Sequence, residues 1–499
     1  VVGESGSGKS IMANAIMQLL PRDVAIDGGK VMFEGRDLAS ATPAEMRKVR
    51  GAGIAMIFQE PMTALNPLRS IGDQIGEMFS IHTKLSKSEI KARVLALLED
   101  VRIPNPAEAA RAFPHELSGG QRQRAMIAMA LALDPRLLIA DEPTTALDVT
   151  TQAQILKLIR ELQLRRKTAV LFITHDFGVV AEIADRVVVM QHGAVVEIGS
   201  ARDVLNDPRH AYTRQLIAAV PPLTAPPPRQ LSDDIILSID HVSKTYRNGG
   251  FFGRGARVTH AVRDVSLKLP RGATLGIVGE SGSGKSTLAR CIIRLIDPDA
   301  GAIVLEGKDW ATMTRENVRR ETRHIQMVFQ DPFASLNPRR KAGDLVAQGP
   351  IVHGTPRAQA MTEAKELFAL VGLDPSAIDR FPHEFSGGQR QRIGLARALA
   401  LKPDVLVADE AVSALDVSVQ AQVLKMLAEL RERLGLSIVF ITHDLRVAAQ
   451  ICDLVAVMKD GEVVEHGLAG EVFGHPRHAY TKALIASIPG GDFARGRRP

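Results

Sequence analysis

One stretch decides the fold of this chain, and it runs Thr274-Leu-Gly-Ile-Val-Gly-Glu-Ser-Gly-Ser-Gly-Lys-Ser-Thr287. The β-branched run that ends at Val278 predicts a buried strand, and the stretch Thr287–Leu295 predicts the helix after it. The glycines between them let successive backbone N–H groups converge on phosphate oxygens, and the positive end of the helix adds to this field. The stretch therefore predicts a phosphate loop in an α/β fold.

The whole set of motifs occurs twice. A copy of the loop stands at Gly3–Ser10, and three later motifs each recur 268 residues further on (386 − 118 = 268), namely Ser118-Gly-Gly-Gln121, Asp141-Glu142 and Thr174-His-Asp176. Short apolar runs that read as strands alternate with helical stretches, for example Leu137–Ala140, Val405–Ala408, Val149–Leu164 and Val417–Leu434. We expect two tandem P-loop NTPase domains, each a mainly parallel sheet flanked by helices, with a helical subdomain inserted before Ser118 or Ser386.

The proline-rich stretch Pro221-Pro-Leu-Thr-Ala-Pro-Pro-Pro228 cannot continue a helix, and it predicts a short, fairly stiff linker. The expected organisation is a first domain at 1–220, a linker at 221–230, a second domain at 231–488 and a tail at 489–499. The second unit has 48 residues before its loop (279 − 231 = 48) and the first has two. We therefore expect the first domain to be truncated at its N-terminus and to fold poorly.

Composition excludes several classes of protein. Hydrophobic residues make up 45% of the 499 residues, which excludes general disorder, and no apolar run approaches the roughly 18 residues of a membrane helix. The net charge of +6 is spread along the chain and does not indicate a nucleic-acid partner. The two cysteines, Cys291 and Cys452, are far apart, as expected of small core residues rather than of a disulfide framework.

The loop residues assigned to nucleotide binding are Gly3, Ser5, Gly6, Gly8, Lys9, Ser10, Gly279, Ser281, Gly282, Gly284, Lys285, Ser286 and Thr287. The two lysines would reach the β- and γ-phosphates, and the hydroxyls of Ser10 and Ser286 would ligate Mg²⁺.

Each unit also carries a pair of acids after a strand, Asp141-Glu142 and Asp409-Glu410. Two adjacent carboxylates belong at the carboxyl edge of the sheet, where ligands bind in open α/β folds. The first acid would hold Mg²⁺ and the second would polarise the attacking water as general base. Solvated acids at a strand end are the alternative, and the duplication disfavours it.

Two further polar residues in each unit are candidates by position. His175 and His443 follow a strand and would contact the γ-phosphate, although a single histidine there is more often structural. Gln59 and Gln330 would face Mg²⁺ and the attacking water.

A second anion-binding helix start is predicted in each unit, at Ser118, Gly119, Gly120 and Gln121 and at Ser386, Gly387, Gly388 and Gln389. A fold that already has a phosphate cradle has no obvious use for another. The economical explanation is that each unit offers this segment to the nucleotide of the other unit.

This ordered set of motifs resembles the ABC-transporter ATPases that have two nucleotide-binding domains fused in one chain, and the resemblance covers essentially all of the sequence. It implies ATP with Mg²⁺ as ligands, and head-to-tail pairing of the domains around two ATP molecules. Asp148 and Asp416 match the family's D-loop at the seam, and Tyr246 matches the aromatic residue that stacks on adenine.

A narrower resemblance lies in Pro208-Arg-His-Ala-Tyr-Thr213 and Pro476-Arg-His-Ala-Tyr-Thr481, which are similar to the His-Pro-Tyr-Thr segment of the peptide/nickel importer branch with alanine in place of the proline. The fused arrangement looks most like the ATP-binding subunits of glutathione importers, although Ala411 replaces a usual proline. The resemblance implies two integral-membrane permeases, a periplasmic solute-binding protein behind them, and a peripheral position on the cytoplasmic face of a bacterial inner membrane.

Two other functions stay open at this point. A soluble tandem ATPase acting on ribosomes or nucleic acid usually has a long charged linker, unlike the proline-rich one here. A nucleotide-binding regulator without turnover is disfavoured by the intact Glu142 and Glu410.

Overall fold

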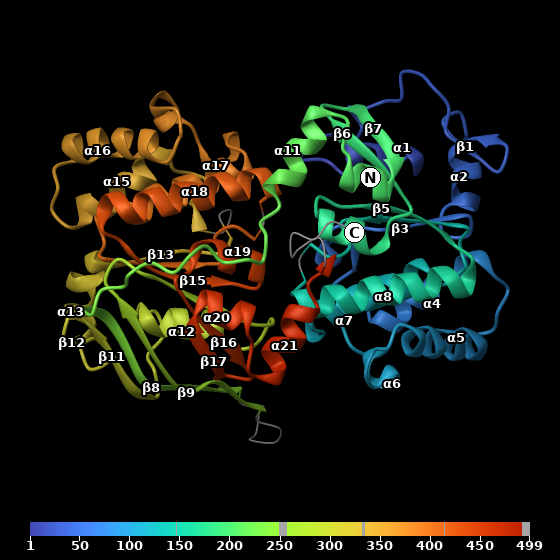
Figure 1. Ribbon diagram of the computed structural model, residues 1–499. Coiled ribbons are helices and arrows are strands. Elements are labelled where there is room, and N and C mark those ends of the chain that lie inside the picture. The colour runs from blue at the N-terminus through green and yellow to red at the C-terminus, as the bar shows by residue number, and fades with distance from the viewer. Residues whose placement is uncertain (146, 249–256, 332–334, 414, 492–499) are drawn as a thin grey trace. The chain divides into compact units, whose positions relative to one another are not determined.

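The computed structural model describes residues 1–145, 147–248, 257–331, 335–413 and 415–491 (Figure 1). They form two compact units, of which the first comprises Val1–Val220 and the second Pro221–Ile488. Most of the predicted tail at 489–499 lies outside the described residues. Each unit is an α/β fold with parallel strands, as the repeated motifs predict.

The central sheet of the second unit has six strands in the order β13-β14-β15-β10-β16-β17. Their bounds are Thr274–Val278 (β10), Ile325–Val328 (β13), Val405–Asp409 (β14), Ser437–Thr442 (β15), Leu454–Lys459 (β16) and Glu462–Leu468 (β17). The pairing is parallel except between β16 and β17. The carboxyl ends of β10, β14 and β15 therefore meet at one edge of the sheet, where the loop and both acids lie.

A second sheet of this unit is antiparallel, in the order β12-β11-β8-β9. Its strands are Ile235–Asn248 (β8), Arg257–Pro270 (β9), Ala300–Leu305 (β11) and Lys308–Asp309 (β12). It shares one hydrophobic core with β10 and α12 (Lys285–Ile292), and Trp310 is fully buried there. The sequence patterns had predicted a mainly parallel sheet and did not identify these antiparallel strands, although Tyr246 of β8 was singled out by resemblance.

The helices of the second unit surround its sheet and form a helical subdomain. Those around the sheet are Lys285–Ile292 (α12), Arg315–Glu321 (α13), Thr322–His324 (η2), Val417–Leu434 (α18), Leu445–Ile451 (α19), Ala469–Gly474 (α20) and Ala479–Ala486 (α21). The helical subdomain holds Ala342–Val352 (α15), Arg357–Leu370 (α16), Pro375–Asp379 (η3), Pro382–Glu384 (η4) and Gly387–Leu399 (α17). Helix α12 starts earlier and ends earlier than predicted, because Lys285 directly continues the loop and Arg294 takes the left-handed conformation.

The first unit repeats this plan with separate strand groups. Its strands are Met32–Phe33 (β1), Arg36–Asp37 (β2), Ile54–Ile57 (β3), Leu137–Asp141 (β4), Ala169–Ile173 (β5), Arg186–Gln191 (β6) and Ala194–Ser200 (β7). Strands β3, β4 and β5 form a parallel sheet, and β6 pairs antiparallel with β7. Val2 forms parallel bridges to Thr174 and Val189, so it takes the place that β10 has in the second unit.

The helices of the first unit cover this sheet and form the helical subdomain. They are Lys9–Ile16 (α1), Pro43–Val49 (α2), Pro61–Ala64 (α3), Ile71–His82 (α4), Lys87–Asp100 (α5), Pro106–Ala109 (α6), Pro114–Glu116 (η1), Gly119–Ala130 (α7), Val149–Arg166 (α8), Phe177–Ile183 (α9), Ala201–Asn206 (α10) and Ala211–Ala219 (α11).

The linker packs against the second unit. The carbonyl oxygens of Pro222 and Thr224 accept hydrogen bonds from Gln450 Nε2, at 2.8 and 3.0 Å. Arg229 donates twice to the Asp453 carboxylate, at 3.0 and 2.8 Å. Asp453 also accepts from the backbone N–H of Thr274 at 2.8 Å. The end of the linker is thus tied to the start of β10, the strand that leads into the phosphate loop.

Candidate active site

The phosphate loops are shaped by glycines at close backbone approaches. Gly279 has φ 152°, and a Cβ there would lie 2.2 Å from the carbonyl oxygen of Met458. Gly284 has φ 102°, and its Cβ would lie 2.0 Å from the carbonyl oxygen of Ala261. A Cβ at Gly282 would meet nothing within 4 Å, so the loop leaves open space beside its backbone. This open cradle of N–H groups fits the phosphates of a nucleotide.

The loop lysines are buried and hold the loop from inside. Lys285 is 5% exposed, and its Nζ donates to the carbonyl oxygens of Gly279 and Glu280 at 2.8 and 2.7 Å. Lys9 is also 5% exposed and makes the same bonds, to Gly3 at 2.7 Å and to Glu4 at 2.8 Å. Both ammonium groups therefore lie inside the concave loop, at the position where the sequence motif predicts that phosphate oxygens bind.

A hydroxyl and a carboxylate meet beside each loop. Ser286 Oγ donates to Asp409 Oδ1 at 3.2 Å, and Ser10 Oγ donates to Asp141 Oδ1 at 3.1 Å. Both aspartates are almost fully buried, and burial raises the pKa of each carboxyl above its ordinary value. A buried carboxylate next to a hydroxyl is a hard oxygen donor set, which fits Mg²⁺.

The acids that follow the aspartates leave their strands in an uncommon conformation. Glu410 has φ 47° and Glu142 has φ 45°, which is the left-handed region that non-glycine residues seldom adopt. Each backbone N–H is held by the neighbouring strand, at Ile441 O for Glu410 (2.9 Å) and at Ile173 O for Glu142 (3.0 Å). Backbone strain of this kind gathers at functional sites.

This turn brings three predicted side chains together in each unit. Gln330 Nε2 donates to Glu410 at 2.6 Å, and His443 Nδ1 lies 3.2 Å from the same carboxylate. In the first unit Gln59 donates to Glu142 at 3.1 Å, and His175 Nδ1 lies 3.2 Å from it. The arrangement places a glutamate, an amide and an imidazole at the sheet edge next to the loop.

Charge in this cluster favours an ionised glutamate. Burial alone would raise the pKa of Glu410, but the hydrogen bond and positive field of His443 outweigh burial and lower it. Burial likewise disfavours the imidazolium form of His443, and the hydrogen bond and charge of Glu410 reverse this and raise its pKa. An ionised glutamate at this position is able to accept a proton from water.

We expect His443 to titrate above its ordinary value of 6.5 in the chain without nucleotide and metal. Because the folded-state pKa is raised, the stability that protonation of His443 beside Glu410 contributes is fully present below the unfolded value of 6.5 and is lost as the pH rises through the higher folded value. NMR titration of labelled histidines measures this midpoint, and a His443→Gln variant assigns the signal. Glu410→Gln should lower the midpoint, whereas a midpoint at or below 6.5 in the unmodified chain would contradict the ion pair.

The second predicted anion site is an exposed helix start in each unit. Ser386 caps α17: its Oγ accepts from Gln389 N at 3.3 Å, while Gln389 Oε1 accepts from Ser386 N at 3.0 Å. Ser118 and Gln121 form the same capping box on α7, at 3.3 and 2.9 Å. Ser386 and Ser118 are exposed, as a site offered to another molecule or domain requires.

Three further residues were assigned by resemblance, two to the D-loop and one to adenine stacking. Asp148 caps α8 by accepting a hydrogen bond from Thr151 N at 2.9 Å, and Asp416 is the N-cap residue of α18. Tyr246 lies on β8 opposite Thr259 and is half-buried. The two cysteines are buried, as predicted for core positions.

Sequence reasoning missed two residues that touch the loops. The phenol oxygen of Tyr480 accepts a hydrogen bond from the backbone N–H of Glu280 at 3.2 Å, and Tyr212 does the same to Glu4 at 3.1 Å. The available signal was the repetition of His-Ala-Tyr-Thr at the end of each unit, but nothing in the sequence says that it returns to the loop.

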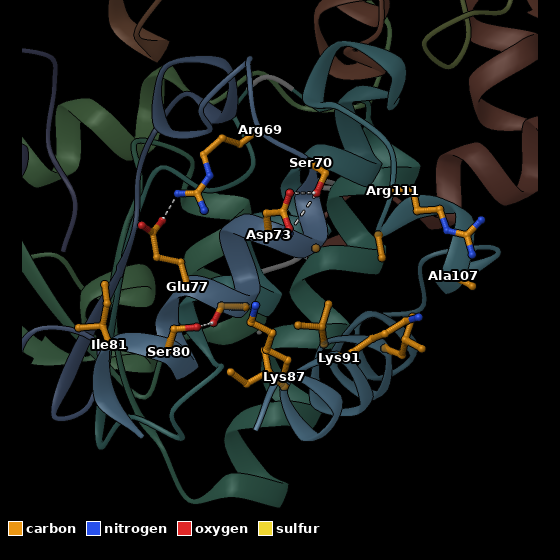
Figure 2. A pocket seen from close by; sticks show the side chains of 16 residues that line it. Arg69, Ser70, Asp73, Glu77, Ser80, Ile81, Lys87, Lys91, Ala107 and Arg111 are labelled. Atoms are coloured by element: carbon orange, nitrogen blue, oxygen red, sulfur yellow. Dashed lines mark hydrogen bonds and ion pairs between the residues drawn. The ribbon is translucent and has the colours of Figure 1, made fainter. Parts of the chain in front are cut away.

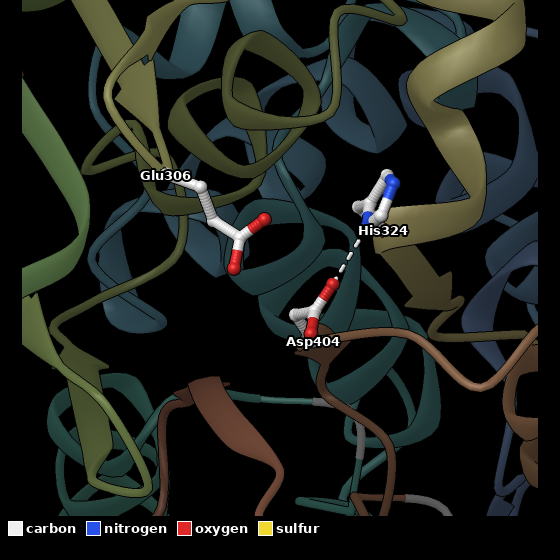
Figure 3. Close-up of side chains that lie close together, drawn as sticks. All are labelled: Glu306, His324 and Asp404. Carbon is white, nitrogen blue, oxygen red and sulfur yellow. Dashed lines mark hydrogen bonds and ion pairs between the residues drawn. The ribbon is translucent and has the colours of Figure 1, made fainter.

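Glu306, His324 and Asp404 lie close together (Figure 3), and His324 and Asp404 directly precede β13 and β14, at the sheet edge opposite the loop. His324 Nδ1 pairs with Asp404 at 2.6 Å, and Nε2 accepts from Arg323 at 3.2 Å. Glu306 pairs with Arg271 at 3.1 Å. Both imidazole nitrogens and the glutamate therefore have protein partners, and these contacts account for the cluster as a network of ion pairs and hydrogen bonds.

A cavity of about 840 Å³ lies between α4, α5 and α6 of the first unit. Figure 2 shows its polar rim, where Ser70 bonds Asp73 and Arg69 pairs with Glu77 at 2.7 Å. Lys87 and the other lining residues come from the helical subdomain, and none of them is among the predicted site residues. The candidate active site is therefore separate from this cavity.

Two family comparisons match the chain in duplicate. The family described as ABC transporter matches residues 1–145 and 262–413. The family described as oligopeptide/dipeptide transporter, C-terminal region, matches residues 196–236 and 464–498. These two pairs of segments include both phosphate loops and both His-Ala-Tyr-Thr segments.

Curated relatives match over the full length. A peptidoglycan transport ATP-binding protein, YejF of Agrobacterium fabrum, is 47% identical over 98% of this chain and 90% of its own length. A glutathione import ATP-binding protein, GsiA of Escherichia coli O6:H1, is 45% identical over 100% of this chain and 85% of its own. The likeness therefore extends over both units and the linker between them.

Proposed function

The chain belongs to the ABC transporter family, and from this premise we propose that it is the ATP-hydrolysing subunit of an importer for peptides or glutathione-like solutes. ABC cassettes of this kind bind ATP and are ATPases. The peptide branch is indicated by the C-terminal segments of both units, which match the oligopeptide/dipeptide transporter family.

One observation supports the proposal that the chain hydrolyses ATP. In both units a glutamate contacts a glutamine and a histidine, next to the phosphate loop and its buried lysine. Two intact copies support two hydrolysing sites rather than one active and one degenerate site. A regulator without turnover would have no need for a carboxylate whose pKa is kept low in a buried position.

The residues have separate roles in the proposed reaction. The ammonium groups of Lys9 and Lys285 exchange their loop carbonyl bonds for phosphate oxygens, and the N–H groups of the loop bind the remaining oxygens. Glu142 and Glu410 accept the proton of the attacking water, which Gln59 and Gln330 orient. His175 and His443 contact the γ-phosphate.

Mg²⁺ fits the donor set beside each loop. Ser10, Asp141 and Gln59 would hold it in the first unit, and Ser286, Asp409 and Gln330 in the second. When bound, it supplies positive charge that neutralises the β- and γ-phosphate oxygens and favours displacement at the γ-phosphorus.

Each ATP is proposed to lie between the loop of one unit and the exposed helix start of the other. One site joins the loop of Lys9 to Ser386, Gly387 and Gly388, and the second joins the loop of Lys285 to Ser118, Gly119 and Gly120. The capped, exposed starts of α7 and α17 support this, because their N–H groups and helix dipoles suit a γ-phosphate. Closure would then depend on ATP and reopening on hydrolysis.

The proposed partners are two integral-membrane permeases and, through them, a periplasmic solute-binding protein at a bacterial inner membrane. No helix within the described residues is long and apolar enough to cross a membrane. A cavity of about 800 Å³ in the second unit is lined by Phe329, Val352 and Arg397, and Val352 is 74% exposed.

Co-expression with candidate permease subunits tests this function. We expect the chain to co-purify with both permeases and to show ATPase activity that the loaded solute-binding protein stimulates. The solute that this binding protein retains then identifies the cargo. Co-sedimentation with ribosomes in place of permease binding would support the soluble tandem ATPase instead.

A further inference from the structure

The tyrosine of each His-Ala-Tyr-Thr segment is bonded to the phosphate loop of its own unit. Tyr480 lies in α21, and its phenol oxygen accepts from Glu280 N at 3.2 Å. Tyr212 lies in α11, accepts from Glu4 N at 3.1 Å and lies 3.3 Å from the Glu4 carboxylate. The same bond occurs twice, across sequence separations of 200 and 208 residues, so it is a repeated feature of the fold.

With this bond, both backbone polar groups of one loop residue, Glu280, are hydrogen-bonded. Glu280 offers its N–H to Tyr480, and its carbonyl oxygen accepts from Lys285 Nζ at 2.7 Å. The loop contains glycines at Gly279, Gly282 and Gly284, which lose more backbone entropy on ordering than other residues. Pinning the second residue of the loop reduces the entropy that remains to be lost when phosphate binds.

The rest of the segment holds the tyrosine in place. The Glu465 carboxylate accepts from the backbone N–H of Arg477 at 2.7 Å and of His478 at 3.0 Å. His478 Nδ1 then accepts from Tyr480 N at 3.2 Å, which starts α21. The histidine and the tyrosine of the segment therefore act together, the first by capping the helix that presents the second.

The first unit builds the same support. Glu197 accepts from Arg209 N at 2.8 Å and from His210 N at 3.1 Å, and His210 Nδ1 accepts from Tyr212 N at 3.2 Å. Tyr212 is 6% exposed, so its phenol is fixed in a packed environment. In the second unit Lys459 Nζ lies 5.1 Å from the centroid of the Tyr480 ring, and Lys459 follows Met458, whose carbonyl oxygen borders Gly279.

We propose that Tyr212 and Tyr480 are positioning residues for ATP binding, and that the C-terminal segment of each unit serves to preorganise the phosphate loop beside it. The inference rests on the proposed function, because it concerns the affinity of the same loops for ATP. In this proposal the C-terminal segment of each unit acts on the phosphate loop of the same unit.

The test removes one hydroxyl in the full-length chain. A Lys9→Ala background leaves the second loop as the ATP site, and Tyr480→Phe is added to it. Because a net protein hydrogen bond is worth about 1 kcal/mol, the Kd for a fluorescent ATP analogue should rise by roughly 3- to 10-fold. Lys285→Ala with Tyr212→Phe is the reciprocal chain, and the same rise is expected there.

Kinetics separate positioning from general damage. The double variant Tyr212→Phe/Tyr480→Phe should raise KM for ATP by a similar factor while kcat stays within about twofold, since the hydroxyls touch no reacting atom. Ser487→Ala is the matched control, because it also removes one hydroxyl hydrogen bond, to Ala483 O at 2.8 Å, at the C-terminal end of α21 and away from the loop.

Three results would overturn the inference. They are an unchanged Kd in Tyr480→Phe, an equal loss of affinity in Ser487→Ala, and a fall in kcat with KM unchanged. A chain that keeps both tyrosines and binds no ATP would instead overturn the proposed function itself.

Discussion

Replacing Glu142 and Glu410 together by glutamine is expected to lower ATP turnover by about 10³-fold, within the 10²–10⁴ range typical of a general base. Glutamine keeps the shape of the side chain and its bonds to neighbouring amides, but it cannot take a proton from water. ATP affinity should be retained or should increase, because a negative charge next to the γ-phosphate is removed. Phosphate release and equilibrium binding of ATP measure the two effects.

A matched control is Glu429→Gln on the exposed face of α18, which removes the same charge away from the site. It should leave turnover unchanged within about twofold. The single variants Glu142→Gln and Glu410→Gln then show whether both sites hydrolyse. Near-normal turnover in either single variant would contradict the assignment of that glutamate as the general base.

Placing an acid at one exposed helix start should disable the site on the opposite unit. In a Lys285→Ala chain, Gly387→Asp is expected to lower the residual turnover by about 100-fold, because the new carboxylate repels the γ-phosphate at the Lys9 loop. Gly119→Asp should have a much smaller effect in this background. In a Lys9→Ala chain the two substitutions should exchange their effects. Steady-state phosphate release measures each pair.

These two variants are chosen so that misfolding does not explain the result. A Cβ at Gly387 or at Gly119 meets nothing within 4 Å, and an acid in the first turn favours the helix through its dipole. Unfolding midpoints should therefore stay close to those of the parent chains. If Gly119→Asp were the more damaging variant in the Lys285→Ala chain, each ATP would be bound within one unit and the head-to-tail pairing would be wrong.

Much of the fold was predictable because its signals are local. The helix predicted at Val417–Leu434 has these same bounds in the structure, since its apolar spacing and its cap at Asp416 all lie within one short stretch. The strand before Asp409 was recognisable for the same reason, as a β-branched run that ends in acids. Duplication strengthened each of these predictions, because two copies of a motif seldom arise by chance.

The geometry of the proposed catalytic cluster, in contrast, could not be predicted from local sequence patterns. The left-handed conformation of Glu410 depends on the N–H bond to Ile441 on the neighbouring strand, which no local pattern specifies. The approach of Gln330 and His443 follows from strand order, and that order is set by the packing of the whole sheet. The antiparallel sheet of β8, β9, β11 and β12 was not predicted, because none of its strands carries a repeated motif and Tyr246 of β8 was singled out only by resemblance.

The sequence by itself determined which chemistry the chain carries: two phosphate loops, two pairs of acids, two capped helix starts and the family to which they belong. The tertiary structure decided how those groups meet. Tyr480 reaches the loop from 200 residues away, and Arg229 of the linker reaches the start of the loop strand through Asp453. Short-range patterns encode residue types and periodicity, whereas contacts between distant segments exist only once the sheet has brought them together.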